Sequence, residues 1–440
     1  MEVVHVAGDT ECGWSWNSSF VKVNERATYR DRDTGATVIQ WTNAPCTNQH
    51  LYFTSFSVTQ DDRWLVILSD RDGHPNLYAI DRRDGAIRRL SNNQNGLLRS
   101  YVYPQGGLSG LSKASPCLDV SRNRIFYVRD DVVYVADLES ERPVCALPPQ
   151  WYCAYTHLSP DGKTFCVPCT DPRAFADDCP TQWGQLKKVP VRVKREGLVT
   201  RLYFVDVEKG MSRIAAEIPF WVTHVQFDPT GSGRMIFNLE GFDEDGRPLP
   251  NRIWCLETDG SYRPLSEQPV TEWRTHENWA LDGQSIVYHG WRVGEGFVAA
   301  RTWDGRLLHE TSYGIQFWHA TGVLDGKRMF VDGQDGTIAM LDPAEHSMTV
   351  LCRHDSSYDN QDAHAHPLTT PTGRSVIFTS NRTGYCQVYE VSCSLWQTLG
   401  NRIYRRLRQR FATTRLWHAL RPIYQRLRGT FAARQAPKEP

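Results

Sequence analysis

The sequence predicts an all-β protein: a seven-bladed β-propeller over residues 1–394, followed by a C-terminal basic amphipathic helical tail over residues 395–440. Three observations predict it. Short apolar runs rich in Val, Ile, Tyr, Phe and Trp fill the first 394 residues. Asp- and Gly-rich turns interrupt these runs at a loosely repeated spacing. The chain has 440 residues, which exceeds an average single domain but suits repeated blades.

The repeat consists of an apolar strand, a polar turn and a second strand, as in residues 63–81 (RWLVILSDRDGHPNLYAID). Spacings of roughly forty to seventy residues suit four-stranded blades with loop insertions. No helical period is evident before residue 395, so no helix is expected in the body. The seven middle turns lie at 69–73, 128–131, 169–172, 240–246, 290–296, 332–336 and 379–384.

The N-terminal segment 29–42 (YRDRDTGATVIQWT) reads as a strand pair without a blade of its own. We expect it to complete the last blade, whose other strands end near Val391. Such a closure removes the open edge that a linear array of sheets would leave.

The overall composition is neutral, with 50 basic and 50 acidic residues. The N-terminus has neither the basic region nor the apolar region of a secretion signal, and no stretch approaches the ~18 apolar residues of a membrane span. A cytoplasmic location is therefore predicted, with reduced thiols among the twelve cysteines. The Cys166-Val-Pro-Cys169 pair is more typical of structural cysteines than of a zinc site.

The tail differs from the body in charge and in period. Eleven basic residues and one acidic residue lie between Leu395 and Pro440, which leaves 39 basic and 49 acidic residues in the first 394. Apolar residues recur at helical spacing, and residues 403–412 are nearly repeated at 423–432. Two readings stay open: binding to an anionic membrane surface, or docking on the acidic propeller or a second copy. Nucleic acid is disfavoured because no binding fold accompanies the charge.

A candidate metal site lies in residues 361–367 (QDAHAHP). On a strand, His364 and His366 would point to the same face, with the Gln361 amide nearby. His276 lies about two blades earlier, before another Asp-Gly turn, and equivalent loops of different blades meet at one mouth of a propeller. Imidazole and carbonyl ligands suit Mn, Fe, Ni or Zn. Taken alone, residues 361–367 also fit an exposed loop.

Here the sequence resembles the oligogalacturonate lyases, the pectin-oligomer lyases of polysaccharide lyase family 22. The Gln361, His364 and His366 spacing matches the family's Q-x-x-H-x-H stretch, and Thr275-His276-Glu277 matches its Thr-His-Glu stretch. Segments 31–42, 49–58 and 200–241 follow the family's order, so the resemblance covers roughly residues 25–392. It implies a seven-bladed propeller that binds a divalent metal, with manganese favoured, through His276, Gln361, His364 and His366.

The resemblance also implies a catalytic pair, His224 as general base and Arg201 as the cation that steadies the substrate charge. The implied substrates are oligogalacturonides or other uronate-containing oligosaccharides, cleaved by β-elimination. We expect both side chains to point into the mouth that holds the metal, with space for one sugar ring. The chain departs from the family pattern at Thr223, Val225 and Leu239, which leaves the exact sugar open.

Two other functions remain as alternatives. Residues 69–85 resemble the blade signature of TolB-type propellers, which serve as binding or scaffolding modules and as enzymes. A propeller enzyme acting on another sugar acid is the third reading. The metal set separates the first two hypotheses, because a scaffold has no reason to gather three imidazoles and an amide around one point.

Overall fold

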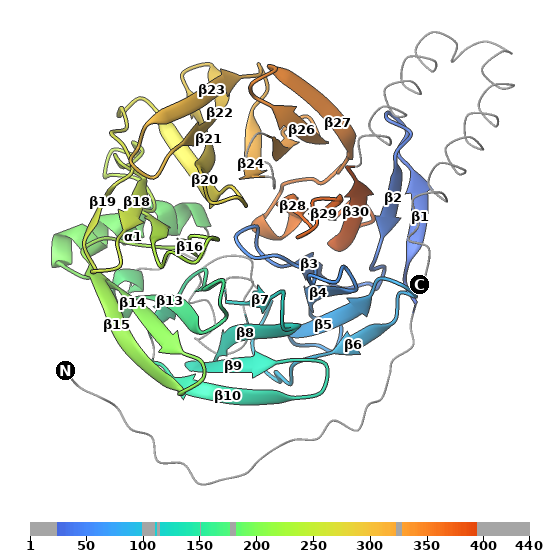
Figure 1. The fold of residues 1–440 in the computed structure, drawn as a ribbon, viewed down its shortest axis with the longest axis horizontal. Helices are drawn as coiled ribbons and strands as arrows, with labels where there is room; N and C mark the ends of the chain where they lie inside the picture. The colour runs from blue at the N-terminus through green and yellow to red at the C-terminus, as the bar shows by residue number, and fades with distance from the viewer. Residues whose placement is uncertain are drawn as a thin grey trace, which may run out of the picture.

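A computed structural model describes residues 24–98, 111, 115–149, 151–176, 182–322 and 328–393. These residues form seven antiparallel sheets arranged around a central axis, as the ribbon in Figure 1 shows. The predicted seven-bladed propeller is therefore confirmed. The predicted helical tail, 395–440, lies outside the described residues.

Six blades follow one another along the chain, each built outward from the central axis. The first three contain β3 (Asn48–His50), β4 (Trp64–Ser69), β5 (Asn76–Asp81) and β6 (Ile87–Arg89); β7 (Cys117–Asp119), β8 (Arg124–Arg129), β9 (Val132–Ala136) and β10 (Glu141–Ala146); and β11 (Tyr152–Cys153), β12 (His157–Leu158), β13 (Thr164–Thr170), β14 (Thr200–Asp206) and β15 (Met211–Ile218).

The next three contain β16 (Val225–Phe227), β17 (Met235–Asn238), β18 (Ile253–Leu256) and β19 (Tyr262–Pro264); β20 (Trp273–Trp279), β21 (Ile286–Arg292), β22 (Glu295–Arg301) and β23 (Leu307–Ser312); and β24 (Phe317–Gly322), β25 (Met329–Gly333), β26 (Thr337–Asp342) and β27 (Ser347–Arg353). The middle strands of these sheets are buried on both faces, because neighbouring blades pack against each side.

The seventh blade joins the two ends of the propeller. It combines β28 (Leu368–Thr369), β29 (Ser375–Ser380) and β30 (Gln387–Ser392) with β2 (Thr37–Gln40) and β1 (Ala27–Arg30) from the N-terminus. Val38 pairs with Val391 in the antiparallel register. Figure 1 shows the blue N-terminal strands beside the red β30. The predicted closure is confirmed.

Each of the seven turns predicted from the sequence lies in the connection between the second and third strands of its blade, and the turn at 169–172 only begins the long connection that contains η1 and α1. Because the strands alternate in direction, these seven turns lie at one mouth of the propeller, together with the beginnings of the seven innermost strands. The side chains that begin the innermost strands therefore meet at that mouth, whereas the turns between first and second strands lie at the opposite one.

The expectation of a body without helices was wrong. Helix α1 (Gln182–Glu196) lies between β13 and β14, after the short 3-10 helix η1 (Pro172–Phe175). Its sequence hides it, because Pro190 interrupts the helical pattern and three valines have low helix propensity. Burial of Leu186, Val189 and Val193 against the third and fourth blades compensates for this.

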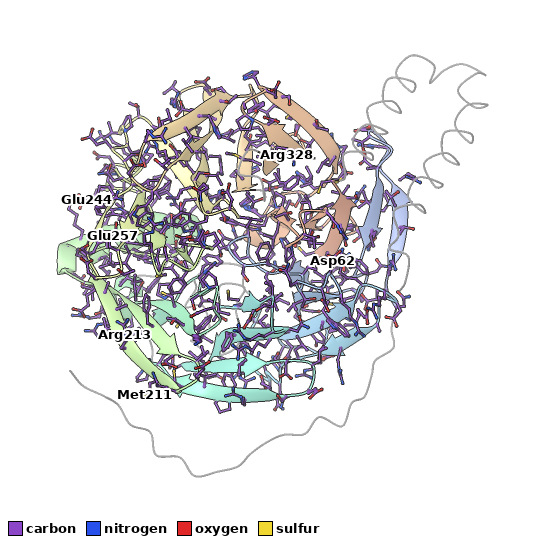
Figure 2. All side chains as sticks on the ribbon, viewed as in Figure 1. Asp62, Met211, Arg213, Glu244, Glu257 and Arg328 are labelled. Carbon is purple, nitrogen blue, oxygen red and sulfur yellow. The ribbon has the colours of Figure 1, made fainter. Side chains whose placement is uncertain are left out.

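Figure 2 shows Met211 and Arg213 of β15 at the outer rim of the ring. Among the described residues, no helix has the length and the apolar character that crossing a membrane requires. The cytoplasmic location stays a prediction.

Candidate metal centre and active site

Five histidines gather at the mouth where the innermost strands begin. His276 belongs to β20 and His319 to β24, while His224 immediately precedes β16. His364 and His366 lie just before β28. The sequence predicted four of these five residues, and the topology of the blades explains why residues so far apart in the chain meet.

Three of these imidazoles can reach one ion. One ring nitrogen from each of His319, His364 and His366 lies within 4.8 Å of the other two. The ring centroids of His319 and His366 are 4.1 Å apart, and the other two pairs are 5.6 Å apart. His319 was not predicted to belong to the site. The available signal was its position, since His319 follows His276 by 43 residues and precedes Gln361 by 42, about one blade each way.

A buried carboxylate holds His319. Asp332, at the end of β25, accepts hydrogen bonds from the His319 backbone N–H at 2.6 Å and from its Nδ1 at 2.7 Å. The hydroxyl of Tyr358 donates to the same carboxylate. Burial alone would raise the pKa of Asp332, but His319 and Tyr358 lower it to about 2. The carboxylate is therefore ionised and accepts a hydrogen bond from Nδ1 of His319.

The segment that carries Gln361, His364 and His366 was expected to be a strand, and this expectation was wrong. Residues Gln361–Ala363 form the 3-10 helix η2, and β28 begins only at Leu368. His366 adopts a positive φ of 44°, which no regular strand contains. The two imidazoles nevertheless converge, because the backbone turns between them. The Gln361 Oε1 atom is buried without a hydrogen-bond partner among the described residues.

His276 stands beside this group. Its ring centroid lies 4.3 Å from that of His319, and its Nδ1 lies 2.7 Å from Nε2 of His289. Burial, followed by the nearby His319 and His289, lowers the pKa of His276 well below its usual value. His276 is therefore neutral, with one ring nitrogen engaged by His289. Its assignment as a metal ligand stays a prediction.

His224 is held by a second buried carboxylate. Its Nδ1 lies 3.0 Å from Oε1 of Glu277, and its Nε2 lies 3.1 Å from the Tyr52 hydroxyl. Arg252, which is also buried, binds Glu277 on one side and Glu240 on the other. Burial would raise the pKa of Glu277, but Arg252 and His224 lower it to about 2. The ionised carboxylate accepts a hydrogen bond from Nδ1, and Nε2 is the ring nitrogen that faces the Tyr52 hydroxyl.

Aromatic rings surround the histidines. Phe53 lies against His224, His276, His319 and His366, with centroid distances of 5.3 to 6.2 Å. Tyr52 stacks on Tyr155 at 3.6 Å. His224 is only 3% exposed, and the Tyr52 hydroxyl covers its Nε2. The expected open space beside His224 is thus filled by Tyr52 in this structure.

Arg201 is held further from the axis, at the start of β14, the third strand of its blade. Its Nε donates to Glu217 at 2.7 Å, and its guanidinium lies 4.5 Å from the Trp151 ring centroid. The side chain is 33% exposed at the same mouth as the histidines. Its catalytic role stays a prediction, and it requires Arg201 to share its charge between Glu217 and a substrate.

The residues at the mouth fit a divalent cation. Three imidazoles converge, and the buried Nε2 of His319 and Oε1 of Gln361 have no hydrogen-bond partner in the described part of the chain. Imidazole nitrogen and amide oxygen are ligands that Mn²⁺ and its neighbours in the first transition row accept. Cys166 and Cys169 form no comparable site, because they face different sides of β13 and pack in different apolar clusters.

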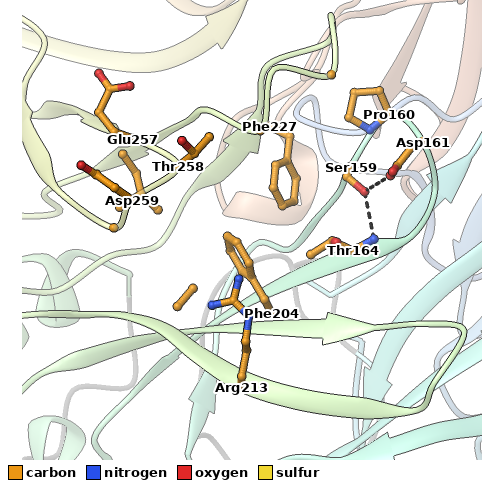
Figure 3. A pocket seen from close by; sticks show the side chains of 15 residues that line it. Ser159, Pro160, Asp161, Thr164, Phe204, Arg213, Phe227, Glu257, Thr258 and Asp259 are labelled. Carbon is orange, nitrogen blue, oxygen red and sulfur yellow. Dashed lines mark hydrogen bonds between the residues drawn. The ribbon is translucent and has the colours of Figure 1, made fainter.

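The cavities at the opposite mouth lack such a group. One, of about 370 Å³, lies between the third and fourth blades and is lined by Phe204, Phe227 and Arg213. Figure 3 shows these side chains with Ser159 bonded to Asp161. A second cavity, of about 260 Å³, is lined by Phe53, His157 and Trp279 among others. Among the described residues, neither cavity contains a group of His, Cys, Asp or Glu close enough to hold a metal ion, so the histidine-lined mouth is the candidate site.

Fold and site together define a class: a propeller with a buried, carboxylate-supported histidine centre at one mouth. The profile of the oligogalacturonate lyase family matches residues 22–394. The chain belongs to this family of polysaccharide lyases.

Known proteins of this family match the chain over nearly their whole length and share its fold. The chain is 22% identical over 397 residues to the oligogalacturonide lyase of Pectobacterium atrosepticum, covering 84% of this chain and 97% of the relative. A solved oligogalacturonate lyase in complex with manganese superposes with a TM-score of 0.71 at 22% identity, covering 88% of this chain and 99% of the other. The oligogalacturonate lyase of Vibrio parahaemolyticus gives 0.70 at 21% identity, with the same coverage.

Proposed function

We propose that the protein is a metal-dependent lyase that cleaves short oligogalacturonides by β-elimination. One observation carries the proposal: a buried His224 with a fixed tautomer lies beside an imidazole group that fits a divalent ion, in a chain of this family. The ligands proposed from the sequence are His276, Gln361, His364 and His366. Manganese is the proposed ion, because a family structure contains it and these ligands suit it.

The reaction removes the proton on C5 of a uronate, forms a C4=C5 double bond and expels the oxygen on C4. The C5 proton is weakly acidic, because the charge left behind must be stabilised on the carboxylate. A divalent cation at the imidazole group, when bound, would neutralise that charge.

His224 supplies the proton acceptor in this proposal. Glu277 keeps the proton on Nδ1, so the lone pair on Nε2 faces the mouth. The C5–H bond would approach Nε2 where the Tyr52 hydroxyl now donates. As His224 becomes an imidazolium, the Glu277 carboxylate stabilises its charge, and Arg252 keeps that carboxylate ionised.

Arg201 supplies the second cation. A guanidinium stays charged at every working pH and can hold a carboxylate or a leaving oxygen with two parallel hydrogen bonds. Trp151 covers one face of its guanidinium, and Nε donates to Glu217, so the N–H groups not engaged by Glu217 or Tyr203 would meet a sugar at the rim of the mouth. Uronates further along an oligogalacturonide would meet it there.

The test combines metal analysis with an assay for the unsaturated product. Purified protein is depleted with a chelator, reconstituted with Mn²⁺ and incubated with digalacturonate. We expect an increase in ultraviolet absorbance from the C4=C5 product, dependent on Mn²⁺ and lost in His224→Gln. Release of reducing ends without absorbance would indicate hydrolysis instead, and would refute the proposed β-elimination.

A different uronate is the second candidate substrate, because the departures from the family pattern adjoin the base. The hydroxyl of Thr223 donates to Glu240 at 2.7 Å, which ties this departure to the network that holds His224. Assays with oligomers of other uronic acids, compared at equal concentration, decide between the two substrates by kcat/KM.

A further inference from the structure

We propose that Cys153 and Cys169 are a redox pair, which a low-molecular-weight disulfide converts reversibly into a disulfide bond beside Arg201. The two cysteines lie opposite each other on β11 and β13, neighbouring strands of the third blade. Their sulfur atoms are 3.6 Å apart. The spacing of Cys166 and Cys169 in the sequence does not reveal this pair, because Cys166 faces the other side of β13.

The register of the two strands suits a disulfide. The Ala154 backbone N–H donates to the Pro168 carbonyl at 3.0 Å, one step along the ladder. Because hydrogen-bonded and non-hydrogen-bonded pairs alternate, Cys153 and Cys169 form a non-hydrogen-bonded pair, whose Cα atoms are typically about 4.5 Å apart. A disulfide spans Cα distances of ~4.4–6.8 Å, so small rotations of the two side chains can bring the sulfurs to about 2 Å while the strands keep their pairing.

The two thiols differ in their access to solvent. Cys169 is fully buried, and this burial, followed by the hydrogen bond with Cys153, raises the pKa of Cys169 well above its usual range. Cys153 is half-buried, so it is the thiol that a dissolved disulfide reaches.

The exchange takes place in two steps. The Cys153 thiolate attacks one sulfur of the small disulfide, forms a mixed disulfide and releases the first small thiolate. Cys169 passes its proton to that thiolate, and its sulfur then attacks the Cys153 sulfur and displaces the second small thiolate. Two electrons thereby pass from the two protein sulfurs to the small disulfide, and an excess of small thiol reverses both steps.

The disulfide would connect to Arg201 through the sheet. Cys169 pairs with Arg201 across β13 and β14, so the two cysteines and the arginine form a row over three neighbouring strands. Trp151, whose ring centroid lies 4.5 Å from the Arg201 guanidinium, packs on the same apolar cluster as both cysteines. Oxidation would draw Cys153 towards Cys169 and change the position of Trp151, two residues away. The effect on substrate binding rests on the proposed function, in which Arg201 meets the sugar.

The first measurement detects the disulfide itself, on the full chain and without substrate. The protein is equilibrated with oxidised and reduced glutathione, the remaining thiols are blocked, and its peptides are analysed by mass spectrometry. We expect a linked Cys153–Cys169 peptide, about 2 Da lighter than the two reduced peptides together, which dithiothreitol removes. Cys153→Ser should lose the linked peptide. Cys145→Ser is the matched control, since Cys145 is a half-buried thiol on the same apolar cluster, and it should keep the linked peptide.

Absence of the linked peptide at every glutathione ratio would overturn the proposal, as would a bond from Cys169 to Cys166 in its place. If Cys153→Ser does not fold, Cys169→Ala replaces it and should lose the linked peptide as well. Initial rates on trigalacturonate then compare the oxidised and the reduced wild type. We expect KM to differ by about threefold or more and kcat by less than about twofold, with no difference in Cys153→Ser.

The two measurements separate the two proposals. An unchanged KM in a protein that carries the disulfide would overturn the connection to Arg201. An active lyase that never forms the linked peptide refutes only this inference. A linked peptide in a protein that makes no unsaturated product refutes only the proposed function.

Discussion

On both sides of the histidine-lined mouth a buried carboxylate holds a histidine, but the groups that bind the two carboxylates differ in charge. On one side Glu277 holds Nδ1 of His224, and on the other Asp332 holds Nδ1 of His319. Arg252 binds Glu277, whereas the hydrogen bonds to Asp332 come from His319 and the neutral Tyr358. The Nε2 atoms differ as well, because that of His224 meets the Tyr52 hydroxyl.

In the proposed function, this difference would separate proton transfer from cation binding. Arg252 is shared between two buried carboxylates, Glu277 and Glu240, so it offsets only one of their two negative charges. In the proposed function His224 would gain a proton beside this network and lose it again within one turnover. A histidine backed by an uncompensated carboxylate is better suited to hold a permanent positive charge. The mouth thus contains two similar His–carboxylate pairs, and the proposed function gives proton transfer to one side and metal binding to the other.

The largest effect expected is from removing two imidazoles on the metal side. His364→Ala combined with His366→Ala should abolish Mn²⁺ binding and reduce lyase activity to background, because only one imidazole of the group of three remains. Metal content by mass spectrometry and the absorbance assay check this. Circular dichroism should show an intact propeller, and full metal content in the double variant would contradict the assignment of this side.

The base side should respond differently. His224→Ala should lower turnover by about 10²–10⁴-fold while metal content stays the same, since a positioned base contributes that much and the three-imidazole group is untouched. Steady-state kinetics with saturating Mn²⁺ measure the first quantity, and metal analysis measures the second. Loss of metal in this variant would mean that the two sides do not act independently.

His157 is a partly buried histidine without a carboxylate partner in the described part of the chain, and it can be compared with the carboxylate-held His224 and His319. His157 lines the cavity at the opposite mouth, and burial lowers its pKa to about 4. Between pH 6.5 and 4 the unfolded chain takes up a proton there that the folded chain does not, so the free energy of unfolding falls as pH falls, by at most about 3 kcal/mol. Denaturant unfolding at pH 7 and pH 5 should show a smaller fall in His157→Gln. An equal fall in both proteins would contradict this.

Substitutions at Arg201 test whether this residue acts on the substrate together with His224. Arg201→Lys should lower kcat/KM by about tenfold, because an ammonium cannot reproduce the planar fork that binds a carboxylate. Glu217→Gln, which removes the charge that now binds Arg201, should leave kcat/KM unchanged or raise it. Initial rates on digalacturonate and trigalacturonate measure both. Wild-type kinetics in Arg201→Lys would remove Arg201 from the site.

The smallest effect concerns a departure from the family pattern. Thr223→Val keeps the shape of the side chain but removes its hydrogen bond to Glu240, and should cost about 1 kcal/mol of unfolding free energy. Turnover should change less than threefold, because Arg252 still binds Glu240 through two nitrogens. Chemical denaturation and kinetics check the two values, and a large loss of turnover would give Thr223 a direct role.

The fold could be predicted from the sequence because the same residue types recur in its turns. Asp or Gly occurs in each of the seven turns, since these residues satisfy tight turns at little steric cost. Helix α1 escaped detection for the opposite reason: its sequence disfavours a helix, and only packing of Leu186, Val189 and Val193 stabilises it. Local sequence does not contain that tertiary contribution.

The site was only partly readable. The spacing of Gln361, His364 and His366 resembled a known motif, although the expected strand is a turn with a positive φ at His366. His319 and Asp332 are thirteen residues apart on neighbouring strands, and each looks ordinary alone. Only the pairing of β24 with β25 brings them together, so their joint role depends on register rather than on a motif.

The closure of the ring also sets the time at which the site is assembled. His50, in the first blade, places its Nε2 2.7 Å from the backbone carbonyl of His366, in the last. During synthesis from the N-terminus, β3 must wait for more than three hundred residues before that partner emerges. Manganese affinity should therefore appear only when the chain is almost complete, and its appearance on stalled ribosomes of increasing chain length would date the final folding step.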